Sequence, residues 1–216
     1  MGRSRCDYCG RTLDAMELVP LASFAVLRGR CRTCGGAIDV RHVLLEAAAA
    51  AIGMASMLAL PGVPGIAAAL FGWILLALAL LDLDHFWLPD RLTGLLALAG
   101  AGVAAAGLAP SLAARLAGGM AGYGSLALIA ALYRHMRGRE GMGMGDAKLL
   151  GAIGLWMGWQ ALPVMLLAAS GGGLLWAGAM RLAGRPLGAT GALPFGALLA
   201  AAAWPLYLFD PLGVVR

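Results

Sequence analysis

Two acidic stretches of the sequence could do chemistry. LLDLDHFWLPDRLT carries Asp82, Asp84 and Asp90, and GMGMGDAKLL carries Asp146, each beside long apolar runs. A carboxylate at membrane depth is energetically costly, so it is a functional candidate by default. Two carboxylates held close together do not both ionise readily, and one keeps a proton while the other stays charged. Asp82 and Asp146 are therefore predicted to form an acid and base pair.

Such a pair can hydrolyse a peptide bond. The charged carboxylate takes a proton from a water as that water attacks the peptide carbonyl, and the protonated carboxyl stabilises the oxyanion or protonates the leaving amine. Gly143 and Gly145 in GMGMGD have no Cβ atoms, so they let an extended substrate backbone approach closely. These residue types indicate a peptidase site.

Each acid also has a structural interpretation. Asp90 stands in LPDRLT, which is typical of a helix start, where a carboxylate caps free amides and favours the positive end of the helix dipole. Asp84 lies two positions from Asp82, points elsewhere on a helix and is expected to be a solvated interface residue. For Asp82 and Asp146 the alternative role is a structural ion pair with Lys148 or with the arginine of LPDRLT.

All four cysteines of the chain lie in its polar first 42 residues, as two CxxC pairs. The candidate metal ligands are Cys6, Cys9, Cys31 and Cys34. Zn²⁺ prefers four tetrahedral ligands, and each CxxC turn presents two sulfurs. Disulfides are the first alternative, but they do not persist in a reducing cytoplasm, and thiol redox cycling is the second. Residues 1–42 are thus predicted to form a small zinc-ribbon-like module held together by structural zinc.

The rest of the chain, residues 43–216, must position the two aspartates and is strongly apolar. With 61% hydrophobic residues, 12% charged residues and a mean hydropathy of +0.83, the sequence lies outside the soluble class. A span needs roughly 17 to 25 helical residues. Seven are predicted, at residues 43–60, 65–81, 92–108, 117–133, 149–162, 164–180 and 191–208. The fold class is therefore an all-α polytopic membrane helix bundle; the sequence leaves the boundary of the fifth and sixth spans open.

Charge indicates the orientation of these spans. Of the 16 basic residues, only Arg115 and Arg216 fall outside if the N-terminus is cytoplasmic, as the positive-inside rule requires. The net charge of +5 is therefore explained by the orientation of the spans. Membrane lipid is an expected partner, and nucleic acid is not. The polar, Arg-rich start shows no secretory signal. Both acidic stretches are expected at the cytoplasmic face.

The motifs together resemble a known family. CDYC and CRTC, LRGRCRTCGGAIDVRHVLLE, DLDHFWLPDRLT and GMGDAKL occur in the order typical of type IV prepilin peptidases, membrane aspartic proteases of the GxGD class. The resemblance covers nearly the whole chain. It implies an enzyme of the bacterial cytoplasmic (inner) membrane that cleaves the basic leader from type IV prepilins and from the pseudopilins of type II secretion. The family's catalytic aspartates map onto Asp82 and Asp146.

A further stretch, ALPFGALLA, also resembles a family element near the last span, and helix packing is its alternative role. The candidate substrate-binding residues are Gly143, Gly145, Lys148, Pro194, Phe195 and Gly196.

Many members of the family also methylate the new N-terminus with S-adenosylmethionine. Their usual form begins with a further helix before the cysteines, whereas this chain opens almost directly on Cys6, so seven spans rather than eight are expected. No glycine-rich cofactor fingerprint occurs. Methyl transfer is left open, with S-adenosylmethionine as its cofactor. The alternative function is a zinc-ribbon membrane scaffold, or a non-proteolytic homologue that binds pilin-like proteins.

Overall fold

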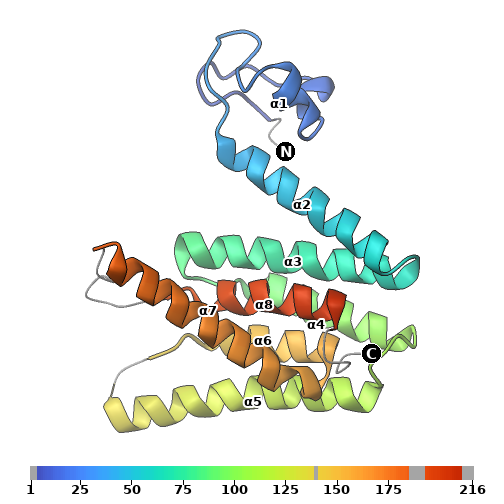
Figure 1. Ribbon diagram of the computed structural model, residues 1–216, viewed down its shortest axis with the longest axis vertical. Helices are drawn as coiled ribbons and strands as arrows, with labels where there is room; N and C mark the ends of the chain where they lie inside the picture. Colours follow the sequence, from blue (N-terminus) through green and yellow to red (C-terminus); the bar gives the residue numbers. More distant parts are fainter. Residues whose placement is uncertain (1–3, 139–140, 185–192, 211–216) are drawn as a thin grey trace. The chain divides into compact units, whose positions relative to one another are not determined.

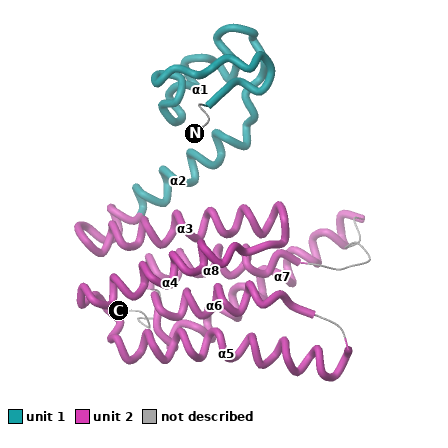
Figure 2. The backbone as a smooth tube through the Cα atoms, turned by 180° about the vertical axis from the view of Figure 1, so that it is seen from behind, with its two compact units in different colours: residues 1–55 teal, residues 56–216 magenta. Residues whose placement is uncertain are grey.

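The computed structural model describes residues 4–138, 141–184 and 193–210 (Figure 1). The described residues are helical apart from turns and two isolated β-bridges, which confirms the all-α class. Two compact units, residues 1–55 and 56–216, divide within helix α2 (Val40–Ala59), as Figure 2 shows. A functional division after residue 42 stays a prediction.

The first unit contains two cysteine turns of the same construction. In each turn a glycine amide donates to the carbonyl of the first cysteine: Gly10 to Cys6 at 2.9 Å and Gly35 to Cys31 at 3.0 Å. Both glycines have positive φ, 68° and 70°, which an L side chain rarely adopts. The glycines that follow the CxxC pairs thus close the turns.

Two short helices connect these turns, η1 (Ala15–Leu18) and α1 (Ala22–Val26). The backbone amide of Leu21 donates to Oε2 of Glu46 in α2 at 2.8 Å, which joins the connection to the start of that helix. The unit has few buried apolar side chains, with Cys31 the buried cysteine. With so small a core, the hydrogen bonds of the two cysteine turns contribute much of the stability of this unit.

The second unit is a bundle built around α6. Its elements are α3 (Val63–His85), α4 (Asp90–Ala105), α5 (Leu112–Arg137), α6 (Met144–Met157), η2 (Trp159–Ala161), α7 (Leu162–Leu182) and α8 (Phe195–Phe209). Helix α6 packs against α4, α5 and α8, and α8 in turn packs against α3 and α7 (Figure 2). Most residues of α6 are buried, so this helix is the centre of the bundle.

Every predicted span falls on a helix of the structure, α2 to α8. Four of the described helical segments are long and apolar enough to cross a membrane: Val40–Ala59, Val63–His85, Leu112–Arg137 and Trp159–Leu182. Their number confirms a multi-pass membrane protein. Helices α4, α6 and α8 are shorter, and the first two residues of the predicted last span lie outside the described residues, so the count of seven stays a prediction.

The predicted fifth span, residues 149–162, was wrong at both ends. Helix α6 begins at Met144 and ends at Met157, because Gly158 has a φ of +78° and turns the chain out of the helix. Helix α7 then begins at Leu162, with Pro163 in its first turn, where proline is tolerated. The boundary between these helices is thus set by Gly158 and Pro163 together.

Trp156 fixes α6 against three other helices. Its ring stacks on Phe71 of α3 with centroids 4.7 Å apart and meets Tyr207 of α8 edge-on at 6.0 Å. Its indole Nε1 donates to the Leu96 carbonyl of α4 at 2.7 Å. Aromatic pairs of this kind contribute about 0.5–1.5 kcal/mol each beyond their burial. Because α3 and α6 carry Asp82 and Asp146, this cluster fixes the helices that hold both acids.

Helices α5 and α6 approach until their backbones touch. A Cβ built on Gly118 would lie 2.5 Å from the Gly154 carbonyl oxygen, and one on Gly122 would lie 2.6 Å from that of Leu150. Small residues at such positions let membrane helices pack closely. No side chain longer than that of glycine fits at this contact without moving one of the helices.

Arg115 is buried in α5, where it binds carbonyl oxygens instead of an acid. Its side chain is 1% exposed and donates to the carbonyls of Pro110 at 3.0 Å, Leu155 at 2.9 Å, Leu108 at 3.2 Å and Ala109 at 2.7 Å. The Leu155 oxygen belongs to the last turn of α6, where the helix dipole favours a cation, and the other three oxygens belong to the loop between α4 and α5. These contacts explain a basic residue away from the segments that are predicted to be cytoplasmic.

Replacing Arg115 with methionine is expected to lower the free energy of unfolding by about 3 kcal/mol, because the buried carbonyls lose their donors. Thermal unfolding of the purified protein in detergent measures the loss. Arg134→Met is the matched control, since Arg134 is an exposed arginine on the same helix and should leave the unfolding temperature unchanged. Equal unfolding temperatures for both variants would contradict this role of Arg115.

Candidate active site

Asp82 lies in the last turn of α3, which ends where Phe86 adopts the left-handed conformation with a φ of 50°. Its side chain is 5% exposed, and its Oδ2 accepts a hydrogen bond of 2.8 Å from the backbone amide of Ala197. That amide belongs to the first turn of α8, whose free N–H groups suit a carboxylate. The amide therefore fixes the orientation of the Asp82 carboxylate.

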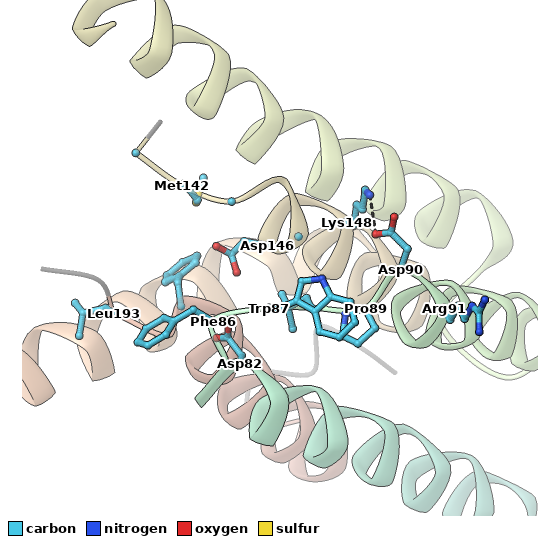
Figure 3. A pocket seen from close by; sticks show the side chains of 15 residues that line it. Asp82, Phe86, Trp87, Pro89, Asp90, Arg91, Met142, Asp146, Lys148 and Leu193 are labelled. Carbon is cyan, nitrogen blue, oxygen red and sulfur yellow. Dashed lines mark hydrogen bonds and ion pairs between the residues drawn. The ribbon is translucent and has the colours of Figure 1, made fainter. Parts of the chain in front are cut away.

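Asp146 lies in the first turn of α6, half-buried, and its carboxylate enters the same cavity as that of Asp82 (Figure 3). The two acids meet at Gly196 of α8. A Cβ built on Gly196 would lie 3.0 Å from Oδ2 of Asp82 and 3.1 Å from Oδ1 of Asp146. Both oxygens are therefore close to one point, at which the glycine leaves room.

Leu88 forms the floor beneath the two acids. It is 7% exposed, in the turn between α3 and α4. A Cβ on Gly145 would lie 3.2 Å from Leu88 Cβ, and one on Gly196 would lie 2.8 Å from Leu88 Cδ1. The two glycines thus let α6 and α8 close onto this side chain, which is an apolar part of the cavity lining.

A cavity of about 1120 Å³ opens above this floor. Of the predicted site residues, its lining contains Asp82, Asp146, Gly143, Gly145, Lys148 and Phe195. Pro194 is the N-cap of α8, and Gly196 is buried next to both carboxylates, outside the cavity lining. The structure thus gathers residues from three distant parts of the chain at one cavity, large enough for several residues of an extended peptide.

The structural alternative for the two acids does not hold in the described part of the chain. There, Lys148 pairs with Asp90, with 2.7 Å between Nζ and Oδ1 (Figure 3), and no ion pair involves Asp82 or Asp146. Asp90 lies in the first turn of α4 beside Pro89, the N-cap, so its predicted place at a helix start is confirmed. Asp84 is exposed and lies outside the cavity lining.

The four cysteines form a second site in the first unit. Their Sγ atoms all lie within 4.8 Å of one another, with 3.9 Å between Cys6 and Cys34. Tetrahedral zinc with Zn–S bonds of about 2.3 Å holds its sulfurs about 3.8 Å apart. All four are free thiols, and backbone amides of Cys34 and Thr33 lower the pKa of Cys31 to about 6. The cluster can therefore bind a metal ion.

Comparison with known families identifies both units. A family model described as "Type IV leader peptidase family" matches residues 69–178, which include both aspartates and make up just over half of the chain. The chain belongs to the type IV leader peptidase family. A second model, "Bacterial Peptidase A24 N-terminal domain", matches residues 1–60, which contain the four cysteines.

Relatives named prepilin leader peptidase/N-methyltransferase are similar to this family member over most of its length. That of Burkholderia pseudomallei (strain 1026b) is 46% identical over 92% of this chain and 64% of the relative. Those of Aeromonas hydrophila and Dichelobacter nodosus are 41% and 37% identical, over 94% and 95% of this chain and 70% and 71% of their own lengths. The chain thus spans about two thirds of the relatives' length. No solved structure matches it.

Sequence reasoning missed two parts of this candidate site. The Ala197 amide contacts Asp82 across 115 positions of the chain, and a backbone amide leaves no mark in the sequence. Leu88 looks like any apolar residue of a turn, although its place directly before Pro89 was a usable signal, because proline fixes the turn that buries it.

Proposed function

We propose that this chain is a membrane aspartic endopeptidase that removes the basic leader from type IV prepilins or pseudopilins. The observation that carries the proposal is the approach of the Asp82 and Asp146 carboxylates to one point beside Gly196, at the base of a cavity of about 1120 Å³. Prepilins are the proposed substrates because relatives of 37–46% identity are named prepilin leader peptidases.

The two acids share one proton in the proposed reaction. A water binds between them, the ionised carboxylate takes its proton, and the resulting hydroxide adds to the scissile carbonyl. The protonated carboxyl then gives its proton to the leaving amine as the C–N bond breaks, so the pair ends the cycle with one proton again. The Ala197 amide keeps the Asp82 carboxylate in place throughout, and Gly143 and Gly145 leave space for the peptide backbone.

The proposed location is the bacterial inner membrane, with the site at its cytoplasmic face. The distribution of arginine and lysine supports this orientation. Phe86 and Trp87, directly after α3, are 57% and 60% exposed, and aromatic side chains of this kind suit the level of the lipid headgroups. Asp82 would therefore lie just inside the interface, where water and an extended peptide can both reach it.

Cleavage of a defined peptide tests the proposal. The peptide carries a basic leader, a glycine before the cut and an apolar segment of about 20 residues after it. Incubation with the purified full chain should yield two fragments with the cut after the glycine, as read by mass spectrometry. A protein that binds this peptide without cutting it would be the scaffold, and the proposed peptidase function would be wrong.

Methyl transfer is a second candidate activity, because the relatives' names include N-methyltransferase. Its substrate would be the new N-terminal amine, and S-adenosylmethionine would supply the methyl group. The same incubation with that cofactor added tests it. A mass gain of one methylene group on the apolar fragment supports methyl transfer, and an unchanged mass opposes it.

The proposed occupant of the cysteine cluster is a structural zinc ion. Four thiolates fill the tetrahedral shell, which leaves no position for a catalytic water. Cys6, Cys9, Cys31 and Cys34 would hold it, and zinc would supply the cohesion that the first unit's small core lacks. The hydrolytic water belongs to the two aspartates instead.

Metal analysis of the purified protein is expected to find about one zinc per chain, and none in a Cys6→Ser and Cys31→Ser double variant. The variant should lose the protease resistance of residues 4–55, because the unit folds around the metal. Chelation that stops cleavage while this unit stays protease-resistant would assign the metal a catalytic role and contradict the structural one.

A further inference from the structure

A second hollow lies on the outer side of α6, between α4 and α5. It has a volume of about 580 Å³, and its lining is largely apolar. Its floor is one face of α6, formed by Lys148, Gly151, Ala152 and Leu155, which follow one another at helical spacing. Gly151 and Ala152 are buried in the bundle, and a Cβ built on Gly151 would lie 2.9 Å from Tyr123 Cβ, so the α5 wall reaches the floor at this point. We call this hollow the α6 groove.

Helices α4 and α5 are the walls of the groove. Both pack extensively on α6 but touch each other little, so their outer parts stay apart. The α4 wall contributes Thr93, Gly94 and Ala97, and the α5 wall contributes Leu116, Gly119, Met120 and Tyr123. The floor and the α4 wall consist mainly of small residues, which let a helix backbone come close.

The α6 groove leads to the catalytic cavity. Asp90 and Lys148 line both hollows, and their ion pair stands where the two meet (Figure 3). From there α6 runs away from Asp146, and its floor from Lys148 to Leu155 extends about 10 Å, at 1.5 Å per residue. A chain lying along this floor would therefore bring its near end to the two aspartates.

We propose that the α6 groove binds the apolar helix that follows the scissile bond of the substrate. This inference rests on the proposed peptidase function and assigns the place at which the substrate's membrane segment docks. The substrate must be extended at the aspartates, but its apolar segment must be helical inside the bilayer, where backbone groups have no water to bind. The groove begins where that change of conformation has to occur.

The shape of the groove favours a helix of small and aliphatic residues over other occupants. A lipid chain needs no floor of glycine and alanine, whereas a helix backbone gains van der Waals contact from it. Binding of a second copy of the chain would not explain why the groove meets the catalytic cavity at the ion pair of Asp90 and Lys148. The groove thus selects substrates by the apolar segment that follows the cut, whereas the catalytic cavity binds the leader.

Filling the groove tests this assignment. Gly94 is half-buried on the α4 wall, and a Cβ built on it meets nothing within 4 Å, so the side chain of Gly94→Leu has room to start into the groove. Gly102→Leu is the matched control, because Gly102 lies exposed on the same helix, also has nothing within 4 Å and is not part of the groove lining. Both substitutions raise helix propensity equally.

Two probes separate docking from cleavage. The long probe has a basic leader, a glycine at the cut and an apolar segment of about 20 residues, and the short probe ends a few residues after the cut. In Gly94→Leu the ratio of kcat/KM for the long probe to that for the short probe should fall about tenfold. In Gly102→Leu the ratio should stay at the wild-type value. An unchanged ratio in Gly94→Leu would overturn the assignment.

Photo-crosslinking gives an independent reading. A photoreactive amino acid at Ala97, in an Asp146→Asn background that retains uncut substrate, should form an adduct with the long probe but not with the short one. Adducts with a second copy of the chain, or with lipid alone in the presence of excess long probe, would contradict the proposal. If the wild-type protein cuts neither probe, the peptidase function itself fails, which is a distinct result.

Discussion

Asp82→Asn and Asp146→Asn are each expected to lower the rate of peptide cleavage by about 10³-fold, because each removes the group that accepts or donates the shared proton. An asparagine keeps the size of the side chain and can still accept the hydrogen bond from Ala197, so the fold should persist. Single-turnover cleavage of the prepilin-type peptide by the purified full chain measures the rate. The unfolding temperature of each variant shows whether it has kept its fold.

Asp84→Asn is the matched control for this pair of variants. Asp84 lies on the same turn of α3 as Asp82 but is exposed and outside the cavity lining, so its replacement should change the rate less than about twofold. An Asp84 variant that no longer cuts, next to an Asp82 variant that still does, would show that the wrong acid of DLDHFWLPD had been assigned.

The same pair sets the shape of the pH profile. Because the two carboxylates lie close to one point, their protons come off in two steps that belong to the pair and not to either residue. The rate should rise as the first proton leaves and fall as the second one does, giving a bell. The Asp84→Asn variant should retain this bell.

The sequence predicts the two acids, because an acid among apolar residues is rare and the motifs around it are specific. It could not predict where in the fold they come together. Gly196 lies next to both carboxylates only because α8 packs against α3 and α6, and such packing depends on side chains spread along the whole chain, among them Trp156 and Tyr207.

The helix boundaries show a second limit of the sequence. Hydropathy placed the fifth span on the apolar residues that follow Asp146, whereas α6 already begins at Met144, because Gly143 is its N-cap and Gly145 is tolerated in its first turn. Helix α6 ends at Gly158, but in the sequence nothing distinguishes this glycine from the other glycines among the 33 of the chain. Whether a glycine ends a helix depends on the tertiary contacts around it.

Arg115 shows a third limit, on the use of charge. Counting basic residues predicts the orientation of the spans, and Arg115 is an exception to that count. In the structure its guanidinium is buried among four backbone carbonyls, so it has a packing role and is no measure of orientation. A count of charges cannot separate these two roles, because each requires the same residue type.

Gly196→Ala is expected to lower kcat by about 10²-fold, because misplacing reacting groups by about 1 Å costs that much. The added Cβ would lie 3.0 Å and 3.1 Å from the two carboxylate oxygens and 2.8 Å from Leu88 Cδ1, so the acids or the floor must move. Gly171→Ala on α7 is the control, since a Cβ at that position meets nothing within 4 Å, and its kcat should not change.

The two roles that the sequence left open for the ALPFG stretch give opposite expectations for Gly196→Ala. If Gly196 serves packing alone, the contact of an alanine Cβ with Leu88 lowers the unfolding temperature, and kcat stays near the wild-type value. If the glycine lets the two carboxylates come close to each other, kcat falls even in molecules that keep their fold. Measuring kcat and the unfolding temperature on one preparation separates these cases. A variant with wild-type kcat would show that the space beside Gly196 takes no part in the reaction.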